Sequence, residues 1–516
     1  MFLIRNKTFT LGCFTLFLLG IFLSQQIALA DPANTLARIS HHFSSRDSVD
    51  ACGLAPSSKT EELKKWVDES AINWIEQKWK AGFIYDEAAV VKLRGYLDSE
   101  DPRIRKLAAR TIIEEVLGVE EPKVDLRLRA LEVLKPFLKV NTESDIYGQI
   151  DVHNHTCMSD AYQTPTALVV EAYENGLSVL GITDHEVFTS EEAIKAADML
   201  GVNLVFGAEA SCKFEDHEVH MLIFGDRKKF NSLSDEGRRI LKKLQNMKEE
   251  WLLRTTTMRD RLRPVFDITD EELKAASRSF IVPLTLFNAI WKKYPEKANE
   301  LEPGCASGKE FFAKYIKNRP GIYEKANDSY ALTIDEAIRL GYELDGKVVL
   351  SHPNELDKDK DKAIGRMKRI FKKARSVKVD GKDASSVFAG PEGHSHKASL
   401  SGIKDAVAEA VEDLNKTTYS KNPLILFAGS DSHGKYSLPD HPLGISGYPQ
   451  DDSQMRVLAS NLSLMTKEKV EAGKTFMPLL TQEEITSLTP VFSSVKDFWN
   501  SDWRSEHQDA VLVYAV

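Results

Sequence analysis

The spacing of hydrophobic residues changes near residue 146 and divides the chain into a helical first part and a mixed second part. From Thr60 to about Val140, apolar residues recur at three- and four-residue intervals, which predicts amphipathic helices. An acidic turn with Pro102 separates two of these helices, and the segment that starts at Asp125 resembles the second. This pattern is typical of one or two HEAT-type helical repeats, and it fits a helical cap on the main domain equally well.

After Ile146, short apolar runs that are mostly rich in β-branched residues predict buried strands. Helical segments separate the first runs, which predicts parallel strands with crossover helices. Polar residues follow several runs directly. A closed parallel barrel brings those strand ends to one face, so we expect a barrel rather than an open sheet. The seven runs are Gln149–Val152, Ser178–Thr183, Val202–Phe206, Val219–Phe224, Lys347–Leu350, Ser386–Ala389 and Leu424–Ala428.

A long, highly charged segment with helical periodicity, Asp226–Gly346, interrupts the alternation of strands and helices. Inserts after barrel strands commonly lie over the catalytic face and shape access to it. Most charges of this segment are typical of solvated helix faces. A few basic side chains are candidates to face an anionic substrate, namely Arg278, Lys314, Lys317 and Arg319.

The first thirty residues have the pattern of a secretory signal peptide. Arg5 and Lys7 give a basic start, an apolar stretch follows, and Ala28-Leu29-Ala30 forms a cleavage pattern before Asp31. We therefore expect a periplasmic or secreted protein; an uncleaved anchor is the alternative. Cleavage would change the formal net charge from −9 to −11, and an acidic chain is not expected to bind extended nucleic acid.

These observations predict four regions along the chain. They are a signal peptide at 1–30, a helical region at 31–145 that offers a surface for a protein partner, a barrel at 146–450 with the insert at 226–346, and a C-terminal extension at 451–516 without an assigned role. Four cysteines remain after cleavage, and we expect them mainly to be buried free thiols, with disulfides as the alternative.

The segment from Asp151 to Asp160 concentrates side chains that bind metals. Alternate side chains of an extended segment point the same way, so His153 and His155 can reach one ion together. Imidazoles and carboxylates in one cluster favour Zn, Mn or Fe over ions that prefer oxygen alone. Further motifs of the same kind follow at Thr183–Glu186, Gly207–Glu209, His220, Ser351–Pro353 and Gly429–Gly434.

The order and spacing of these motifs resemble the PHP superfamily (the polymerase and histidinol phosphatase domain), over roughly Ile150 to Gly444. The resemblance implies a distorted (β/α)7 barrel that holds two or three divalent metal ions. It implies His220, His352 and Arg278 as catalytic residues and Asp151 and Asp184 as residues that support the ligands, with Asp184 orienting an imidazole. The implied metal ligands are His153, His155, Asp160, His185, Glu209, His220, His352, Asp431 and His433.

One segment departs from the family pattern. The sequence Gly390-Pro-Glu-Gly-His394-Ser-His396 stands where relatives have a glycine-rich segment with an acidic residue. His394 or His396 can therefore act as a substrate contact, a proton donor or an extra metal ligand, and a flexible surface loop explains the two histidines equally well. Lys314 of the insert is a further candidate for a substrate contact.

The proposed cluster suits hydrolysis. Two ions lower the pKa of a shared water and stabilise the oxygens that gain charge in the transition state. We favour an exported phosphoesterase acting on a small phosphorylated substrate. The alternatives are a hydrolase of the same fold that cleaves a carboxylic ester, carbamate or amide, and a non-catalytic metal-binding scaffold. No G-x-S-x-G motif is present, which argues against a serine nucleophile.

Overall fold

The computed structural model describes residues 57–81, 87–161, 163–276, 281–319, 321–322, 331–394, 402–434 and 443–444, together with 455, 458, 459 and 462. The chain divides into two compact units, Met1–Glu115 and Val116–Val516. Within the described residues, no helix has both the length and the apolar character needed to cross a membrane. The predicted signal peptide lies outside these residues.

The first unit contains three described helices. They are α3 (Ser57–Ala81), α4 (Glu87–Tyr96) and α5 (Pro102–Glu115). Apolar residues from all three helices are buried between them, among them Ile75, Leu93 and Ile112. The ring of Trp74 packs edge-on against Tyr96 at a centroid distance of 6.2 Å. The helical character predicted for this region is therefore confirmed, whereas its relation to HEAT repeats stays a prediction.

The second unit is built around a nearly closed barrel, as predicted. Seven strands follow one another in the order β1-β2-β3-β4-β6-β9-β10, and the short strand β5 (Leu332–Thr333) pairs with the outer part of β3. Each of the seven predicted runs overlaps one of these strands. The strands are β1 (Ile150–Asp151), β2 (Val179–Ile182), β3 (Leu204–Phe214), β4 (His217–Phe224), β6 (Lys347–Leu350), β9 (Phe388–His394) and β10 (Phe427–Ala428).

Backbone hydrogen bonds close the barrel between its first and last strands. Val152 N donates to Ala428 O at 3.2 Å, and Asn154 forms a parallel bridge with Ser432. Inside the barrel, apolar side chains from β1, β2, β3, β4, β6, β9 and β10 form one cluster, which includes Val152, Leu222 and Phe427. Met455, Ala459 and Leu462 join this cluster, so part of the C-terminal extension contributes to the barrel core.

The expectation that all barrel strands are parallel was wrong for β4. This strand runs antiparallel to both β3 and β6. The reason is local, because only Glu215 and Asp216 separate β3 from β4, and so short a connection permits only a hairpin. As a result, Glu209 and His220 lie within adjacent strands of this hairpin and not at strand ends.

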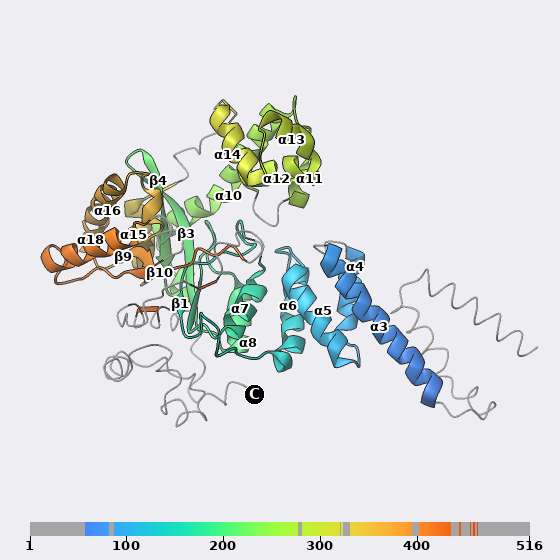
Figure 1. Ribbon diagram of the computed structural model, residues 1–516. Helices are drawn as coiled ribbons and strands as arrows, with labels where there is room; N and C mark the ends of the chain where they lie inside the picture. Colours follow the sequence, from blue (N-terminus) through green and yellow to red (C-terminus); the bar gives the residue numbers. More distant parts are fainter. Residues whose placement is uncertain are drawn as a thin grey trace, which may run out of the picture. The chain divides into compact units, whose positions relative to one another are not determined.

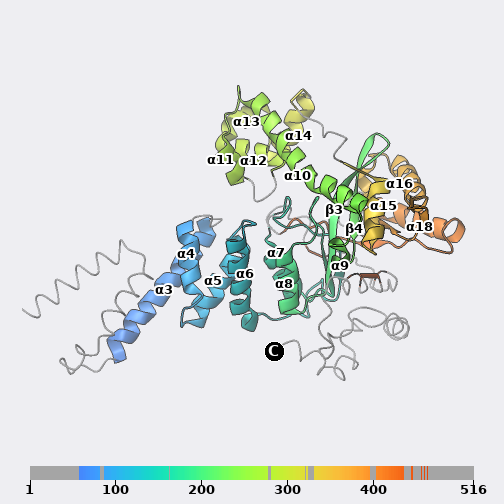
Figure 2. The ribbon, with the colours of Figure 1, turned by 180° about the vertical axis from the view of Figure 1, so that it is seen from behind.

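Helices surround the barrel. Figures 1 and 2 show α7 (Pro165–Glu174) and α8 (Glu191–Leu200) on one side, and α15 (Ile334–Glu343), α16 (Lys360–Arg375) and α18 (Lys404–Thr417) on the opposite side. Thr164 and Ser190 cap α7 and α8 by accepting hydrogen bonds from Ala167 N and Ala193 N. The remaining short elements are η1 (Lys135–Phe137), α9 (Arg227–Phe230), η2 (Pro353–Glu355), β7 (Lys378–Val379) and β8 (Lys382–Asp383).

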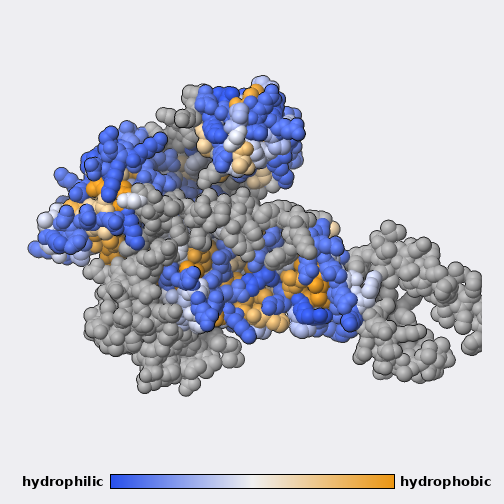
Figure 3. All heavy atoms as spheres, in the orientation of Figure 1, coloured by the Kyte–Doolittle hydropathy of each residue, from blue (hydrophilic) through white to orange (hydrophobic). Residues whose placement is uncertain are grey.

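The insert forms a helical module with its own core. The long helix α10 (Asp235–Leu262) packs against α15 near its start and against α12 towards its end. Phe266, Phe287 and Phe311 lie in the core of the module, and Figure 3 shows its visible surface as mostly hydrophilic. Within the predicted range 226–346, α15 packs against β3, β4 and β6 and is a barrel helix. The other insert helices are α11 (Asp270–Ala276), α12 (Pro283–Lys293), α13 (Pro295–Leu301) and α14 (Gly308–Asn318).

A buried ion pair joins α6 (Glu121–Leu134) to α7 and α8. The Arg127 guanidinium donates to both carboxylate oxygens of Glu192, at 2.7 and 2.6 Å, and to the carbonyl oxygens of Val116 and Gly118. Glu192 also accepts a hydrogen bond from Thr166 Oγ1 at 2.7 Å. Both charged side chains are almost completely buried. The helix α6, which lies in the predicted helical region, is therefore tied to the barrel helices.

Candidate metal centre

All nine residues implied as metal ligands come together at one end of the barrel. They form three groups, and within each group the ligand atoms lie within 4.8 Å of one another. One is deeply buried, and the other two are partly exposed. The groups are His153, Glu209, His352 and Asp431; His155, Asp160, His185 and His433; and His185, Glu209 and His220.

Glu209 is the centre of this arrangement. Its Oε2 lies 3.3 Å from both His153 Nε2 and His155 Nε2, and 3.2 Å from His185 Nδ1. Its Oε1 lies 3.2 Å from His220 Nδ1. The carboxylate is completely buried, and Oε2 makes no hydrogen bond within the described residues. A buried anionic oxygen among imidazole nitrogens fits a bound cation, and the nitrogen and oxygen donor set indicates a divalent metal.

The segments that close the barrel also carry ligands. His155 N donates to Ser432 O, and Asp431 N donates to His153 O, each at 2.9 Å. Asp151 is buried beneath them and accepts hydrogen bonds from Ser430 N at 3.0 Å and from Gly444 N at 2.9 Å. Asp151 therefore holds the backbone that presents the ligands, in agreement with its predicted supporting role.

Asp184 supports a loop, whereas the sequence suggested that it orients an imidazole. Its carboxylate accepts hydrogen bonds from Thr156 N, Thr156 Oγ1 and Ser159 Oγ, each at 2.7 Å. These bonds fix the turn that carries Asp160. The physical reason is that the turn beginning at Thr156 directs its own amide and hydroxyl groups at the Asp184 carboxylate, which accepts their hydrogen bonds.

Two ligands occupy backbone conformations that are unusual for residues with a side chain. His352 has a φ of 40° and Asp431 a φ of 54°, both in the left-handed region. Such conformations cost about 1–3 kcal/mol each and occur where the surrounding structure imposes them, often at functional sites. Here they aim both side chains into the deeply buried group.

The electrostatics of the cluster favour ionised carboxylates. Burial alone would raise the pKa of Glu209, but the neighbouring histidine charges hold it well below its ordinary value. Burial also disfavours protonation of His155, yet hydrogen bonds to Asp431 and Glu209 raise its pKa to about 9. Burial lowers the pKa of His185 to about 3. A cation that binds here must displace the proton of His155, so binding is expected to release protons.

Comparison with known proteins finds a family model that matches part of the chain. Residues 151–281 match the family model for the PHP domain. This match covers the first three motifs and the first part of the insert, and it agrees with the resemblance inferred from the sequence.

Two curated relatives match a short part of this chain. The 5'-3' exoribonuclease Rnm of Escherichia coli (strain K12) is 40% identical over 76 residues, which are 14% of this chain and 26% of the relative. A 5'-3' exoribonuclease of Haemophilus influenzae is 37% identical over 73 residues, which are 14% of this chain and 27% of the relative. The matched part thus spans about a quarter of the length of these relatives.

Two solved structures are similar to larger parts of this chain. A protein of Bifidobacterium adolescentis described as a metal-dependent phosphoesterase has a TM-score of 0.45 and 22% identity, and the match covers 60% of this chain and 95% of that chain. An amidohydrolase from Chromobacterium violaceum, with bound sulfate and no metal, has a TM-score of 0.44 and 20% identity over 58% of this chain and 92% of that chain.

Several predicted site residues either lie outside the described side chains or are engaged within the insert. Arg278 and His396 lie outside the described residues, as does the side chain of His394. Lys314 is exposed and donates a hydrogen bond to Pro303 O, and Arg319 stacks on Tyr315 and pairs with Glu302. Both of these side chains are therefore engaged within the insert. The three described cysteines, Cys157, Cys212 and Cys305, are buried free thiols as expected.

The sequence patterns gave no role to one buried residue beside the cluster, Glu392. Its Oε1 lies 2.6 Å from His153 Nδ1, and its Oε2 accepts a hydrogen bond from His352 N at 3.0 Å. Glu392 is completely buried on β9. A Cβ at Gly429 would lie 2.4 Å from Glu392 Oε1, which explains the glycine. A proton on His153 Nδ1 leaves Nε2 free to face the cluster, as carboxylate–histidine–metal arrangements require.

Substituting Glu392 by Gln is expected to weaken metal binding about 10- to 100-fold, because the neutral amide holds the His153 ring less firmly and makes it a weaker ligand. Metal affinity measured by competition with a chelator tests this result. Glu215→Gln is the matched control, since Glu215 pairs with Arg369 at the surface and touches none of the clustered histidines. Equal affinities for Glu392→Gln and the control would contradict the role of Glu392.

Proposed function

We propose that this protein is a metal-dependent hydrolase of phosphoric esters that uses two or three divalent ions of Mn, Zn or Fe. The observation that supports it best is the buried Glu209 carboxylate, whose two oxygens face five histidines. When bound, the ions would supply a hydroxide nucleophile near neutral pH and neutralise charge on the ester oxygens. The PHP domain match supports the same class of activity.

The chain's own residues would position the ester and move protons. His220 lies on β4 and His352 follows the adjacent strand β6, and their rings meet edge-on at a centroid distance of 5.4 Å. Each has a second carboxylate neighbour, at 3.7 Å for Glu218 and 3.5 Å for Glu355. A histidine that pairs with a carboxylate can hold a proton at one nitrogen, as protonation of a leaving oxygen requires.

A buried arginine of the insert is a candidate contact for an anionic substrate. Arg254 on α10 is only 2% exposed, and its guanidinium carbon lies 4.4 Å from the ring centroid of Trp251. The pKa of Glu218 is lowered mainly by its hydrogen bond with His220 and further by the charge of Arg254, which places this charge near the cluster. Guanidinium binds phosphate oxygens in a bidentate manner. Arg254 thus joins Arg278 as a candidate contact.

Replacing Arg254 by Met is expected to lower kcat/KM for phosphoesters by about 10-fold or more, corresponding to roughly 1.4 kcal/mol of transition-state stabilisation. Hydrolysis of a neutral ester and metal content should change little, because both depend on the cluster itself. Arg259→Met on the same helix is the control, since Arg259 pairs with Asp260 and Asp270. An equal loss on charged and neutral esters would mean that Arg254 only supports the fold.

The curated relatives suggest a second candidate substrate. Both are named 5'-3' exoribonucleases, so the phosphodiester at the 5' end of an RNA is a further candidate for the same site. The acidic composition of the chain favours a short substrate over an extended nucleic acid. The two candidate substrates are distinguished by incubating the metal-loaded protein with a 5'-labelled RNA oligonucleotide and with a small phosphomonoester, and by measuring which of them is hydrolysed.

One assay separates the classes of function. Protein loaded with Mn, Zn or Fe is tested against a chromogenic phosphate ester, a chromogenic acetate and a chromogenic amide, after its metal content has been measured. Activity on the phosphate ester is the expected result. Activity only on the acetate or amide would favour hydrolysis of a carbon ester or amide, and metal binding without any turnover would favour a non-catalytic scaffold.

We also propose that the protein is exported, on the strength of the basic start and the Ala28-Leu29-Ala30 pattern. Cleavage is expected after Ala30, so that Asp31 becomes the first residue of the mature chain. Mass spectrometry of protein isolated from the periplasmic or secreted fraction tests this. An intact Met1, or protein found in the cytosol alone, would contradict export.

A further inference from the structure

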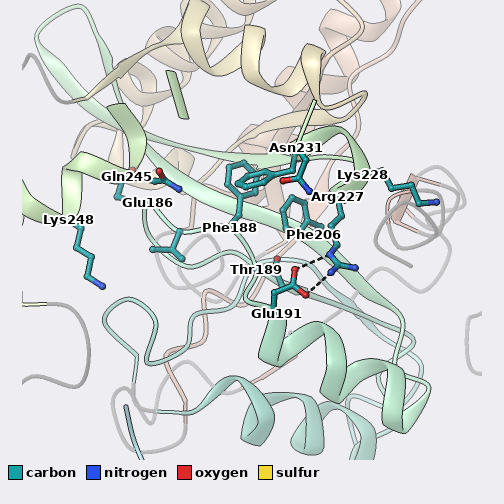
Figure 4. Close-up of a pocket in the computed structure, with 12 residues that line it drawn as sticks. Glu186, Phe188, Thr189, Glu191, Phe206, Arg227, Lys228, Asn231, Gln245 and Lys248 are labelled. Atoms are coloured by element: carbon teal, nitrogen blue, oxygen red, sulfur yellow. Dashed lines mark hydrogen bonds and ion pairs between the residues drawn. The ribbon is translucent and has the colours of Figure 1, made fainter. Parts of the chain in front are cut away.

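A pocket of about 650 Å³ lies beside the metal-ligand cluster and is not used by the proposed chemistry. Its walls come from the segment after β2, from β3, from the region of α9 and from α10 of the insert. Figure 4 shows Phe188, Phe206 and Asn231 in its middle, Gln245 and Lys248 on one side, and Arg227 with Glu191 on the other. A pocket of this volume is in the range that binds small organic molecules.

Three phenylalanines form one side of the pocket. The rings of Phe188 and Phe206 stack with centroids 5.1 Å apart and an angle of 21° between their planes. The ring of Phe230 stands on edge to both, at 5.2 Å from Phe188 and 5.6 Å from Phe206. Phe188 and Phe206 are buried, and Phe230 is half-buried. Such a surface favours a further aromatic ring, which can stack or pack edge-on against it.

Polar side chains line the rest of the pocket. The amides of Asn231 and Gln245 can each donate and accept hydrogen bonds, which suits a ring that carries polar groups at its edge. Lys248 is half-buried on α10 and adds a positive charge on the side of Glu186. The opposite end is closed by the ion pair of Arg227 with Glu191, at 2.6 Å.

The pocket shares a wall with the cluster. Glu186, which lines the pocket, directly follows the implied ligand His185. The Glu186 carboxylate accepts a hydrogen bond from Ser211 N at 3.0 Å, and Ser211 pairs with His220 in the ladder between β3 and β4. A small ester whose reacting group lies at the cluster can therefore extend past Glu186 into this pocket.

We propose that this pocket binds the organic part of the substrate, and that this part is a planar aromatic ring with hydrogen-bonding groups at its edge. The proposal rests on the phosphoesterase function proposed above. The aromatic side of the pocket holds the ring, the two amides bind its polar edge, and the positive charge of Lys248, on the side of Glu186, attracts the phosphate bonded to the ring. Aryl phosphoesters are thus the substrates that use the pocket, whereas small alkyl phosphoesters reach the cluster without it.

The test fills the pocket and compares two substrates. Gln245 is exposed on α10 and lines the pocket, so Gln245→Trp places a large ring there without disturbing the core. KM for 4-methylumbelliferyl phosphate is expected to rise about 10-fold or more, while kcat/KM for ethyl phosphate and metal content stay within about twofold. Lys242→Trp is the matched control, because Lys242 is exposed on the same helix and does not line the pocket. This variant should match the wild type on both esters.

Two results would overturn the proposal. They are an equal loss on both esters in Gln245→Trp, and an unchanged KM for the aryl ester. A second measurement keeps the proposal independent of turnover, namely fluorescence titration of 4-methylumbelliferone into an Asp431→Ala variant. If 4-methylumbelliferone binds and the substitution Gln245→Trp weakens this binding, the proposed pocket is supported. If in addition no phosphoester is hydrolysed, only the proposed phosphoesterase function is contradicted. Absence of binding in the variant that retains Gln245 overturns the pocket itself.

Discussion

Glu209→Gln is expected to remove bound metal and to lower hydrolysis by roughly 1,000-fold or more, which corresponds to about 4 kcal/mol of transition-state stabilisation. Glutamine has nearly the same shape, so the barrel should remain folded. It lacks the negative charge, however, and one of its two terminal atoms is an NH2 group that cannot bind a cation. Because Glu209 Oε1 and Oε2 face different histidines, the substitution affects two of the three groups directly.

Metal content, kcat/KM and thermal unfolding should be measured on the same preparation. The expected pattern is loss of metal and activity together with unfolding close to that of the wild-type apoprotein. Glu215→Gln is a suitable control, since Glu215 lies at the turn of the same hairpin and pairs with Arg369 at the surface. A Glu209→Gln protein with full metal content and full activity would exclude the proposed centre.

The second large effect concerns stability. Arg127→Met is expected to destabilise the second unit by about 3–5 kcal/mol, because it leaves the Glu192 carboxylate charged and buried without its partner. The substitution also removes donors from the carbonyl oxygens of Val116 and Gly118. Urea unfolding followed by circular dichroism gives the free energy of unfolding.

Arg129→Met is the matched control for this measurement, because Arg129 lies on the same helix but is exposed. It should change the free energy of unfolding by no more than about 0.5 kcal/mol. Adding Glu192→Leu to Arg127→Met should recover part of the loss, since a buried ion pair replaced by apolar groups is often close to neutral. A cost below about 1 kcal/mol for Arg127→Met alone would show that the pair does not tie α6 to the barrel helices.

The seven strand positions could be read from the sequence because they depend on local patterns. A run such as Lys347–Leu350 is apolar and β-branched, and it is buried in the barrel whatever its neighbours are. The same holds for the helices that follow Thr164 and Ser190, whose capping residues lie directly before them. The buried residues Met455, Ala459 and Leu462 also have helical spacing, which is a local signal in the C-terminal extension.

The direction of β4 and the role of Asp184 could not be read from periodicity alone. The apolar pattern of a strand is the same for both directions, and only the two-residue link to β3 decides between them. Similarly, Asp184 stands next to a ligand in the sequence, but its partners are set by the turn from Thr156 to Ser159, which folds back onto it.

The sequence by itself determined the strand positions, because apolar periodicity acts over a few residues, and the resemblance of its short motifs to the PHP superfamily implied the nine clustered residues. Only the tertiary structure decided how these residues share one centre. His153 meets Glu392, 239 residues away, and the segments after β1 and β10 close the barrel through Asn154 and Ser432. Contacts at such separations depend on how strands pack around a common core. No local pattern encodes that packing, so Glu392, the Arg127 ion pair and the aromatic pocket became visible only in the folded chain.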